Sequence, residues 1–471
     1  MNAVSTDNLS LEDMDRQCVM HPLTDLNAHE SGASDPQIIT GGKGIHVYDQ
    51  NGRDLIDGFA ALYCVNIGYG RTEIAEAIYE QAKKLAYFHA YRGTSNEPLI
   101  RLSHRILSLA PEGMSKVFYG MSGSDANETQ VKIAWHYNNV LGRPNKKKII
   151  SRERAYHGST IMSGSLTGLP RFHANFDLPL DIVFHTVAPH HYWGAEPGLN
   201  EAGYALACAE ALDAMIEEEN PDTVAAFIAE PMMGTGGIVP PPDGYWSHIQ
   251  QVLKKHDVLL IADEVVTGFG RLGTQFGCNH YDIKPDLMTV AKGLTSAYLP
   301  LSGVIVGNRV WEILKQGSEE FGPFSHGFTC SGHALGAAAA LANLDVIANE
   351  GLVENAGKTG GLLNARLHEE FDDHLMVGEV RGVGLLAAVE FVANKQSKIR
   401  FDTGLNVGAK VTARCLEQGL ITRAMPGGDI LGFAPPLCIT TDEVERVVEI
   451  AKGAVADIAD ELVRDKSWKP A

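Results

Sequence analysis

The sequence has few cysteines, and their spacing excludes the common cysteine-based scaffolds. Seven cysteines are scattered over 471 residues, and none forms a Cys-x-x-Cys pair. This pattern argues against a disulfide framework and against a structural zinc site. We therefore expect free thiols, most of them small buried side chains in a reducing compartment, and no metal centre.

Basic residues and long apolar runs are also scarce. Lys and Arg total 39 against 58 Asp and Glu, which gives a formal net charge of -19. Nucleic acids and anionic membrane surfaces are bound by clustered Lys and Arg, so neither is an expected partner. No apolar run approaches the ~20 residues of a membrane span, and the polar, acidic start does not resemble a signal peptide. We expect a cytoplasmic protein.

Hydrophobic residues make up 45% of the chain, which is enough for a sizeable core. The length suits about three domains, or one large α/β unit with a smaller companion. Alternating residues at 43–57 around Asn51-Gly52 predict a β-hairpin with a type I′ turn. Helical spacing follows at 74–85 and at 96–109, and Lys146 to Lys148 are interpreted as a solvated loop.

Short β-rich runs alternate with helical stretches from about residue 115 to 310. This alternation predicts an α/β fold with a mainly parallel sheet covered by helices on both faces. We expect a large domain at 71–335 and a smaller α+β domain built from residues 1–70 and 336–471. The predicted strands are 116–119, 148–151, 181–185, 223–229, 258–262, 286–290 and 304–306, and the C-terminal part adds helices at 335–348 and 442–463 and a strand at 384–392.

Distinctive residues follow five of these strands. Ligands bind at the carboxyl ends of strands in such sheets, so these residues are expected to meet. Each has a structural alternative: a serine N-cap, an aromatic core residue, a carboxylate with a buried partner, or a lysine that reaches solvent. The residues are Ser122-Gly123-Ser124 at a helix start, Tyr156-His157, Glu230, Asp263 and Lys292.

Together these groups match the needs of pyridoxal 5′-phosphate. A helix N-terminus binds phosphate, and an aromatic ring stacks on the planar cofactor. A carboxylate keeps the pyridine nitrogen protonated, and a lysine amine attacks the aldehyde carbon. The sequence therefore predicts pyridoxal 5′-phosphate as the cofactor.

The sequence resembles the class III aminotransferases of the fold type I pyridoxal-phosphate enzymes, within the amine or ω-amino acid:pyruvate branch. The resemblance rests on the run from Leu259 to Arg271, LLIADEVVTGFGR, and on Lys292, 29 residues after Asp263. It extends from Asp57-Gly58 to Ala434-Pro435-Pro436, nearly the whole chain, and includes residues 327–333, GFTCSGH.

The resemblance implies roles for individual residues. Lys292 would bind the cofactor covalently and then move the substrate proton, and Asp263 would bind the pyridinium nitrogen. The other implied cofactor contacts are Ser122, Gly123 and Ser124 at the phosphate, Tyr156 and Val265 on the two ring faces, His157 and Glu230 nearby, and Phe328 and Thr329 from a second subunit. The resemblance thus implies a homodimer with shared active sites, or a tetramer.

A substrate pocket with aromatic walls and one movable arginine is also implied. Arg423, followed by a Gly-rich stretch, would bind a carboxylate and swing away for an apolar amine. Tyr63 stands where many relatives have tryptophan, and Leu23 where several have phenylalanine, so taurine, β-alanine and aliphatic diamines stay open beside arylalkyl amines. The implied wall residues are Leu23, Leu62, Tyr63, Tyr91, Tyr156 and Thr235.

Our leading hypothesis is a ping-pong transaminase that moves an amino group from a primary amine or ω-amino acid to pyruvate, giving alanine. An aminomutase of the same fold would need no keto acid and would not show ping-pong kinetics. A noncatalytic descendant would lack the absorbance of bound cofactor.

Overall fold

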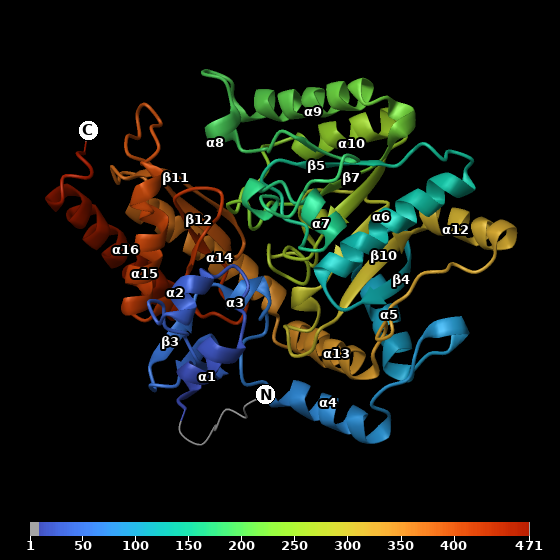
Figure 1. Cartoon of the computed structure of the whole chain (residues 1–471), viewed down its shortest axis with the longest axis horizontal. Helices are drawn as coiled ribbons and strands as arrows, with labels where there is room; N and C mark the ends of the chain where they lie inside the picture. Colours follow the sequence, from blue (N-terminus) through green and yellow to red (C-terminus); the bar gives the residue numbers. More distant parts are fainter. Residues whose placement is uncertain (1–8, 471) are drawn as a thin grey trace.

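The computed structural model describes residues 9–470, which form one seven-stranded sheet and two four-stranded sheets with helices around them (Figure 1). All seven predicted strands of the central region are confirmed, and they form the large sheet together. In spatial order these are β4 (Met114–Gly120), β10 (Ser302–Gly307), β9 (Leu287–Val290), β8 (Leu259–Asp263), β7 (Val224–Ala229), β5 (Lys148–Arg152) and β6 (Val183–Thr186).

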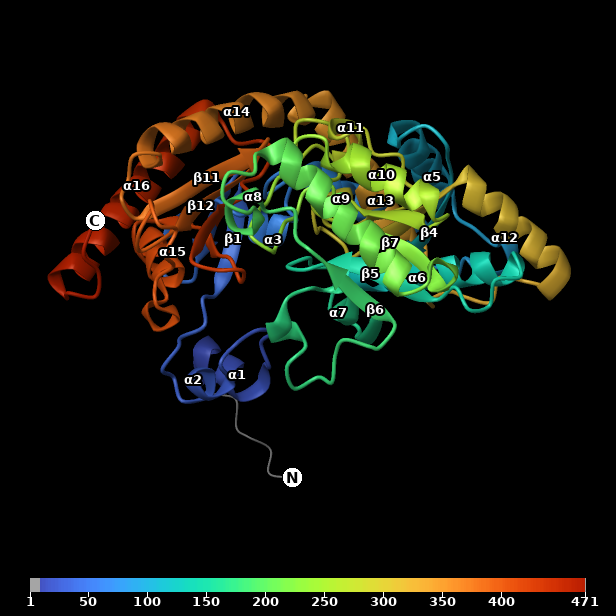
Figure 2. The ribbon, with the colours of Figure 1, turned by 90° about the horizontal axis from the view of Figure 1, so that it is seen from above.

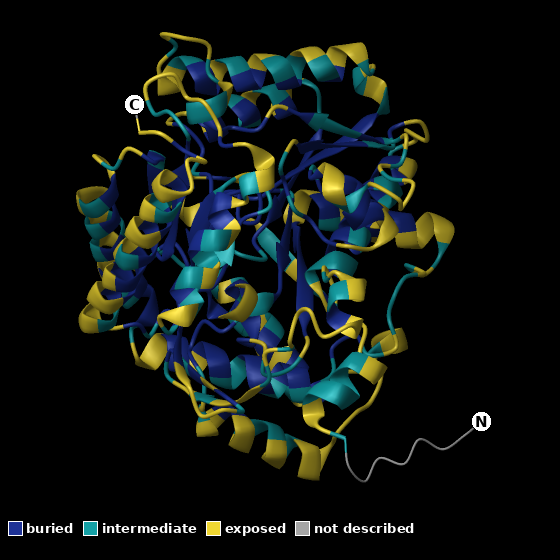
Figure 3. Ribbon diagram, turned by 60° about the vertical axis from the view of Figure 1, so that its left-hand side comes forward, coloured by how far each residue is buried: buried dark blue, intermediate teal, exposed yellow. Residues whose placement is uncertain are grey.

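The large sheet is mainly parallel, as predicted. Only β10 runs antiparallel to its neighbours, β4 and β9. Helices cover both faces (Figure 2). On one side lie α6 (Gly123–Val140) and α7 (Ile161–Leu166), and on the other α9 (Glu201–Glu218) and α10 (Tyr245–Lys255). Strands β7, β8 and β9 are buried along their whole length, which explains their continuous apolar sequences. Figure 3 shows this buried centre beneath an exposed helical surface.

The large sheet is accompanied by helices from before, within and after the region 115–310. The helix α13 packs against α4 and α5, and its Ala-rich face allows the close approach. These helices are α4 (Thr72–Lys84), α5 (Glu97–Leu109), α6 (Gly123–Val140), α7 (Ile161–Leu166), α8 (His191–Gly194), α9 (Glu201–Glu218), α10 (Tyr245–Lys255), α11 (Gly277–His280), α12 (Asn308–Phe321) and α13 (Ala334–Asn349).

Segments from the two ends of the chain share the second sheet. Strand β13 lies parallel to β3, so the N-terminal and C-terminal parts are side by side (Figure 1). This arrangement is of the kind predicted for the smaller domain, whose boundaries at residues 70 and 335 stay predictions. The second sheet contains β1 (Ile39–Lys43), β2 (His46–Asp49), β3 (Asp54–Asp57) and β13 (Leu420–Ile421); the third contains β11 (Val377–Val383), β12 (Leu386–Phe391), β15 (Ile430–Phe433) and β14 (Arg423–Ala424).

The remaining helices belong to these terminal parts. They are α1 (Leu11–Cys18), α2 (Leu26–Glu30), α3 (Ala60–Tyr63), α14 (Leu352–Phe371), α15 (Val407–Glu417) and α16 (Thr441–Arg464). Among residues 9–470, no helix combines the length and apolar character that a membrane crossing needs.

Two local predictions were wrong. The hairpin β2–β3 is present, but four residues, 50–53, connect its strands, and of these only Gly52 has a positive φ (77°), so the turn is not type I′. Lys146 does not lie in a solvated loop: its side chain is buried, and its Nζ donates to the carbonyl oxygen of His256 at 3.2 Å. A buried backbone acceptor replaces water for this ammonium group.

Candidate active site

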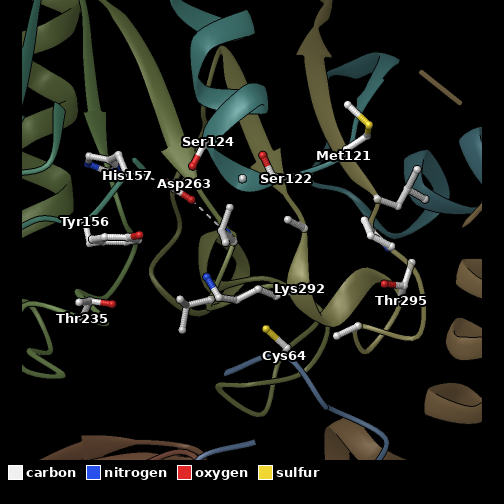
Figure 4. Close-up of a pocket in the computed structure, with 18 of the residues that line it drawn as sticks. Cys64, Met121, Ser122, Ser124, Tyr156, His157, Thr235, Asp263, Lys292 and Thr295 are labelled. Atoms are coloured by element: carbon white, nitrogen blue, oxygen red, sulfur yellow. Dashed lines mark hydrogen bonds and ion pairs between the residues drawn. The ribbon is translucent and has the colours of Figure 1, made fainter. Parts of the chain in front are cut away.

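One cavity opens at the carboxyl ends of the large sheet's central strands (Figure 4). The predicted residues that line it come from five strand ends and the loops after them. These are Ser122, Gly123, Ser124, Tyr156, His157, Glu230, Thr235, Asp263, Val265 and Lys292. The topology therefore brings together groups that lie up to 170 positions apart in the chain.

The N-terminus of α6 forms one wall of the cavity. Ser122 is its N-cap, and Ser122 and Asp125 cap each other in a capping box. The following N–H groups have no intrahelical acceptor, because they belong to the first turn. Gly158 (φ 135°) lies so close that a Cβ there would be 2.4 Å from the Ser124 Oγ. The N–H groups and hydroxyls at this helix start can donate hydrogen bonds to a phosphate group.

Asp263 ends β8 inside the cavity and is held from two sides. Its Oδ2 lies 2.7 Å from Nδ1 of His157 and accepts a hydrogen bond from Nδ2 of Asn127 at 2.8 Å. Its Oδ1 accepts from the backbone N–H of Val265 at 3.1 Å. The carboxylate is only 3% exposed, so these contacts fix its direction in a region with little water.

Asn127 is itself locked in place. Its Oδ1 accepts a hydrogen bond from the Thr289 hydroxyl at 2.6 Å, which leaves its NH₂ group to face Asp263. Because Thr289 lies on the adjacent strand β9, the sheet sets the orientation of this amide. Asn127 therefore positions Asp263. Sequence reasoning did not identify this role.

Lys292 lies at the opposite side of the cavity, directly after β9. Its φ is 36°, a region that residues other than glycine rarely adopt. The following turn is fixed by Asn343, whose Nδ2 donates to the carbonyl oxygens of Gly293 and Leu294. A strained backbone held by its surroundings is typical of functional sites.

Tyr156 and Glu230 complete the wall beyond Lys292. One carboxylate oxygen of Glu230 accepts from the Tyr156 N–H at 3.2 Å, and the other from the Gly234 N–H at 2.7 Å. Burial raises the pKa of Glu230, and the nearby His157 and Arg152 together with the Gly234 N–H oppose that rise in part. Glu230 therefore shapes the loop that presents Tyr156.

The donor set fits pyridoxal 5′-phosphate. The first turn of α6 offers N–H groups and hydroxyls for a phosphate, and Asp263 is a buried carboxylate directed at the cavity. Lys292 supplies an amine to the same space, as Figure 4 shows. A buried carboxylate needs a cationic or hydrogen-bonding partner, which a protonated ring nitrogen would provide.

Phe328, Thr329 and Tyr91 do not line this cavity. They gather at another surface region, where the Tyr87 hydroxyl donates to the Thr329 carbonyl oxygen at 2.6 Å. Tyr91 is 44% exposed and lines a second cavity beside Gly327. Within a single chain these residues are therefore separate from Lys292.

The other residues predicted to line the substrate pocket also lie in different places. Tyr63 is buried behind the cavity, with its ring 4.5 Å from that of Phe59, and its hydroxyl faces the Met425 sulfur. Burial raises the pKa of Tyr63. The Arg423 guanidinium lies 5.7 Å from the centre of the Phe59 ring. Leu62 and Leu23 are exposed on the surface.

Sequence reasoning also missed Cys64, which lines the cavity beside Lys292 (Figure 4). It follows the run 60–63, where Ala60, Ala61 and Tyr63 all have positive φ. No pattern in the sequence indicates this strain. For Asn127 a signal existed, because it lies one turn after Gly123 on the helix that opens at the site.

Residues 28–455 match the protein family described as Aminotransferase class-III. Diaminobutyrate--2-oxoglutarate transaminase from Halomonas elongata is 59% identical over 462 residues, 98% of each chain. Gamma aminobutyrate transaminase 1, mitochondrial, from Solanum lycopersicum is 42% identical and covers 92% of this chain and 84% of its own.

Solved structures give the same result. A structure from work on the directed evolution of transaminases by ancestral reconstruction is 65% identical, with a TM-score of 0.95, and covers 96% of this chain and 99% of its own. The omega transaminase from Pseudomonas jessenii in complex with PMP is 43% identical, with a TM-score of 0.94 and the same coverage.

Proposed function

The chain belongs to the class III aminotransferases, which use pyridoxal 5′-phosphate, and from this premise we propose that it moves an amino group from a primary amine or ω-amino acid to pyruvate. The observation that carries the proposal is the meeting of Lys292, Asp263 and the α6 N-terminus in one cavity. Without any one of these groups, cofactor-dependent transamination would lack an essential contact.

The cofactor, when bound, supplies an electron sink for the carbon that bears the amino group. In our proposal Asp263 holds the proton at the ring nitrogen, and the clamp of His157 and Asn127 keeps its carboxylate in place. The Lys292 Nζ would take the proton from the substrate carbon and deliver it to the cofactor carbon within the same half-reaction, and the second half-reaction would run this transfer in reverse. Tyr156 closes the cavity wall and limits water access.

The charges near the cavity favour a keto acid with one carboxylate. Lys292 is the only Lys or Arg among the described residues that line the cavity. Arg423 lies nearby, half-buried, over Phe59. One arginine can bind one carboxylate bidentately, whereas 2-oxoglutarate needs a cation for each of its two carboxylates. We therefore propose pyruvate as the acceptor.

Single-turnover spectroscopy of the cofactor tests this proposal. The aminated enzyme is mixed with pyruvate or 2-oxoglutarate, and the aldehyde form with β-alanine, taurine, putrescine or diaminobutyrate. We expect pyruvate to restore the aldehyde form at least about tenfold faster than 2-oxoglutarate, about 1.4 kcal/mol. Faster reaction with 2-oxoglutarate would reject pyruvate as the preferred acceptor while leaving transamination intact.

Arg423→Ala should separate the two half-reactions. Loss of the bidentate partner should lower the specificity for pyruvate about 30- to 1000-fold, because a charge pair of this kind contributes roughly 2 to 4 kcal/mol. The half-reaction with a simple alkylamine makes no such contact and should change less than about fivefold. Single-turnover rates for both half-reactions provide the measurement.

Arg400→Ala is the matched control, since Arg400 also belongs to the C-terminal part and lies 3.8 Å from the Trp193 ring. It should leave both rates near wild type. Equal losses in both half-reactions of Arg423→Ala would assign this arginine a structural role and remove it from the substrate pocket.

We further propose that the surface region of Tyr91, Phe328 and Thr329 completes the active site of a second copy of the chain. Tyr87, Phe88 and Tyr91 are each more than a third exposed there, which is unusual for neighbouring aromatic side chains. Pairing of two copies would cover these rings and bring the Thr329 hydroxyl to the partner's phosphate.

Thr329→Ala should therefore weaken cofactor retention, and the loss should grow as the protein is diluted. One hydrogen bond to a charged group contributes roughly 1.5 to 3 kcal/mol, so affinity should fall about 10- to 150-fold. Cofactor content after gel filtration at several protein concentrations gives the measurement. Ser325→Ala, also exposed in this segment, is the control. Unchanged, concentration-independent retention in Thr329→Ala would contradict the shared site.

A further inference from the structure

The N-terminal segment contains a side-chain cluster that transamination does not use. Asp15 lies in α1, His29 in α2, and His21 in the connection between them. The Nε2 atom of His21 is 2.8 Å from Asp15 Oδ1, and the Nε2 atom of His29 is 3.1 Å from the same oxygen. The three atoms lie within 4.8 Å of one another. Two imidazoles thus direct the same ring nitrogen at one carboxylate.

His29 is the buried member of the cluster. It is 6% exposed, and within the described chain its Nε2 has no hydrogen-bond partner of acceptable geometry. A buried polar atom without a partner costs free energy. The His21 nitrogen, in contrast, is hydrogen-bonded to Asp15. A metal ion that accepts the lone pair of His29 would satisfy the unpaired nitrogen.

Two other groups of potential metal ligands occur in the described residues, and basic side chains already fill them. Around His190, the Arg381 guanidinium contacts both carboxylates of the group, at 2.6 and 2.8 Å. Around His256, the Lys255 ammonium contacts both carboxylates, at 2.8 and 3.6 Å. In these groups the protein supplies its own cation.

No basic side chain takes that position beside Asp15 in the described residues. The adjacent Arg16 is directed elsewhere, with ion pairs to Asp13 at 3.0 Å and to Asp35 at 2.5 Å. Only the two imidazoles face the Asp15 carboxylate. The position between the three ligand atoms is therefore available to an external cation.

The segment also has few other contacts that could hold it together. The helix α1 has eight residues and no buried side chain, and α2 has five residues, of which only His29 is buried. Isolated helices of this length are unstable in water. Figure 2 shows α1 and α2 together at the edge of the molecule, and Glu12 of α1 accepts a hydrogen bond from Gln50, which follows β2. A cross-link between them would stabilise both helices and the loop between them.

We propose that Asp15, His21 and His29 bind a divalent transition metal, with Zn²⁺ as the best match, and that the ion joins α1 to α2. Two imidazole nitrogens and one carboxylate oxygen are a common zinc ligand set, with water in the fourth position. Ca²⁺ and Mg²⁺ prefer oxygen ligands, whereas two of the three ligand atoms of this site are nitrogens. We therefore expect both ions to bind weakly. The expectation of no metal centre rested on cysteine spacing, which does not bear on His and Asp ligands.

The test is a zinc titration of tag-free holoenzyme, stripped with chelator and freed of excess cofactor, in competition with a chromophoric chelator. We expect one Zn²⁺ per chain. Loss of a residue that hydrogen-bonds to a metal ligand lowers metal affinity about 10- to 100-fold. Loss of a ligand itself, in His21→Ala or His29→Ala, should therefore lower the Zn²⁺ affinity at least about 100-fold. His46→Ala should bind as wild type does, because among residues 9–470 the ion pairs of His46 are with Asp54 and Glu443 and none is with Asp15.

Metal binding by the wild-type protein tests the proposal even if a variant does not fold. Co²⁺ should give the intense visible bands of a four-coordinate site, and Zn²⁺ should displace it. Asp15→Asn, which keeps the side-chain size, should abolish these bands while transaminase activity shows that the enzyme is folded. Absence of stoichiometric binding by the wild type, or equal binding by Asp15→Asn, would overturn the metal site and leave the proposed function untouched.

Discussion

Lys292→Ala is expected to lower transamination by at least about 10⁴-fold while the fold is kept. The side chain would serve both as the covalent attachment point and as the base that moves the substrate proton. Removing a catalytic group with a central role lowers the reaction rate by several orders of magnitude. The exposed side of Lys292 faces the cavity, so its loss leaves no unpaired group in the core. Turnover with pyruvate and a saturating amine gives the measurement.

A second readout separates a chemical loss from a structural one. Borohydride reduction followed by denaturation should leave the cofactor mass on the wild-type chain and not on the variant. Lys146→Ala is the matched control, since Lys146 is a lysine outside the cavity whose Nζ donates to the backbone of His256. Turnover above a few per cent of wild type in Lys292→Ala, with no amine present other than the donor substrate, would reject the assignment.

Asp263→Asn should retain the cofactor and lower the rate by about 10²- to 10⁴-fold. A neutral amide cannot hold a proton at the ring nitrogen, and removing one preorganised charge or donor from other active sites has effects of this size. The amide also turns one acceptor of the His157 and Asn127 clamp into a donor, which opposes the Asn127 NH₂ group. Cofactor content and single-turnover rates should therefore change independently.

Asp286→Asn provides the control for a half-buried carboxylate directly before β9 of the same sheet. Asp286 accepts from the Leu260 N–H at 2.9 Å and does not line the cavity. Its variant should lose stability and keep the catalytic rate of the folded fraction. Near-normal single-turnover rates in Asp263→Asn would mean that another acid faces the ring nitrogen.

Much of the fold is encoded in local patterns. Short β-rich runs identified all seven strands of the large sheet, and β7, β8 and β9 are continuously apolar because strands buried on both faces leave no polar alternation. Asn96 before Glu97-Pro98 marked the start of α5, since an N-cap side chain acts within one turn. The loop of the β2–β3 hairpin was less predictable, because hairpin loops of two residues and longer ones can contain the same Asn-Gly pair.

Sequence alone determined that this chain is an α/β class III aminotransferase, and it identified the residues that follow the strands. Tertiary structure decided which of them meet. Lys292 and Asp263 share a cavity because β8 and β9 are parallel neighbours, whereas Phe328 and Thr329 lie elsewhere on the same chain. The clamp of Asn127 on Asp263, the cluster of Asp15 with two histidines and the burial of Lys146 depend on side-chain directions across separate elements. Such contacts carry no local signal, because they arise only when distant segments pack.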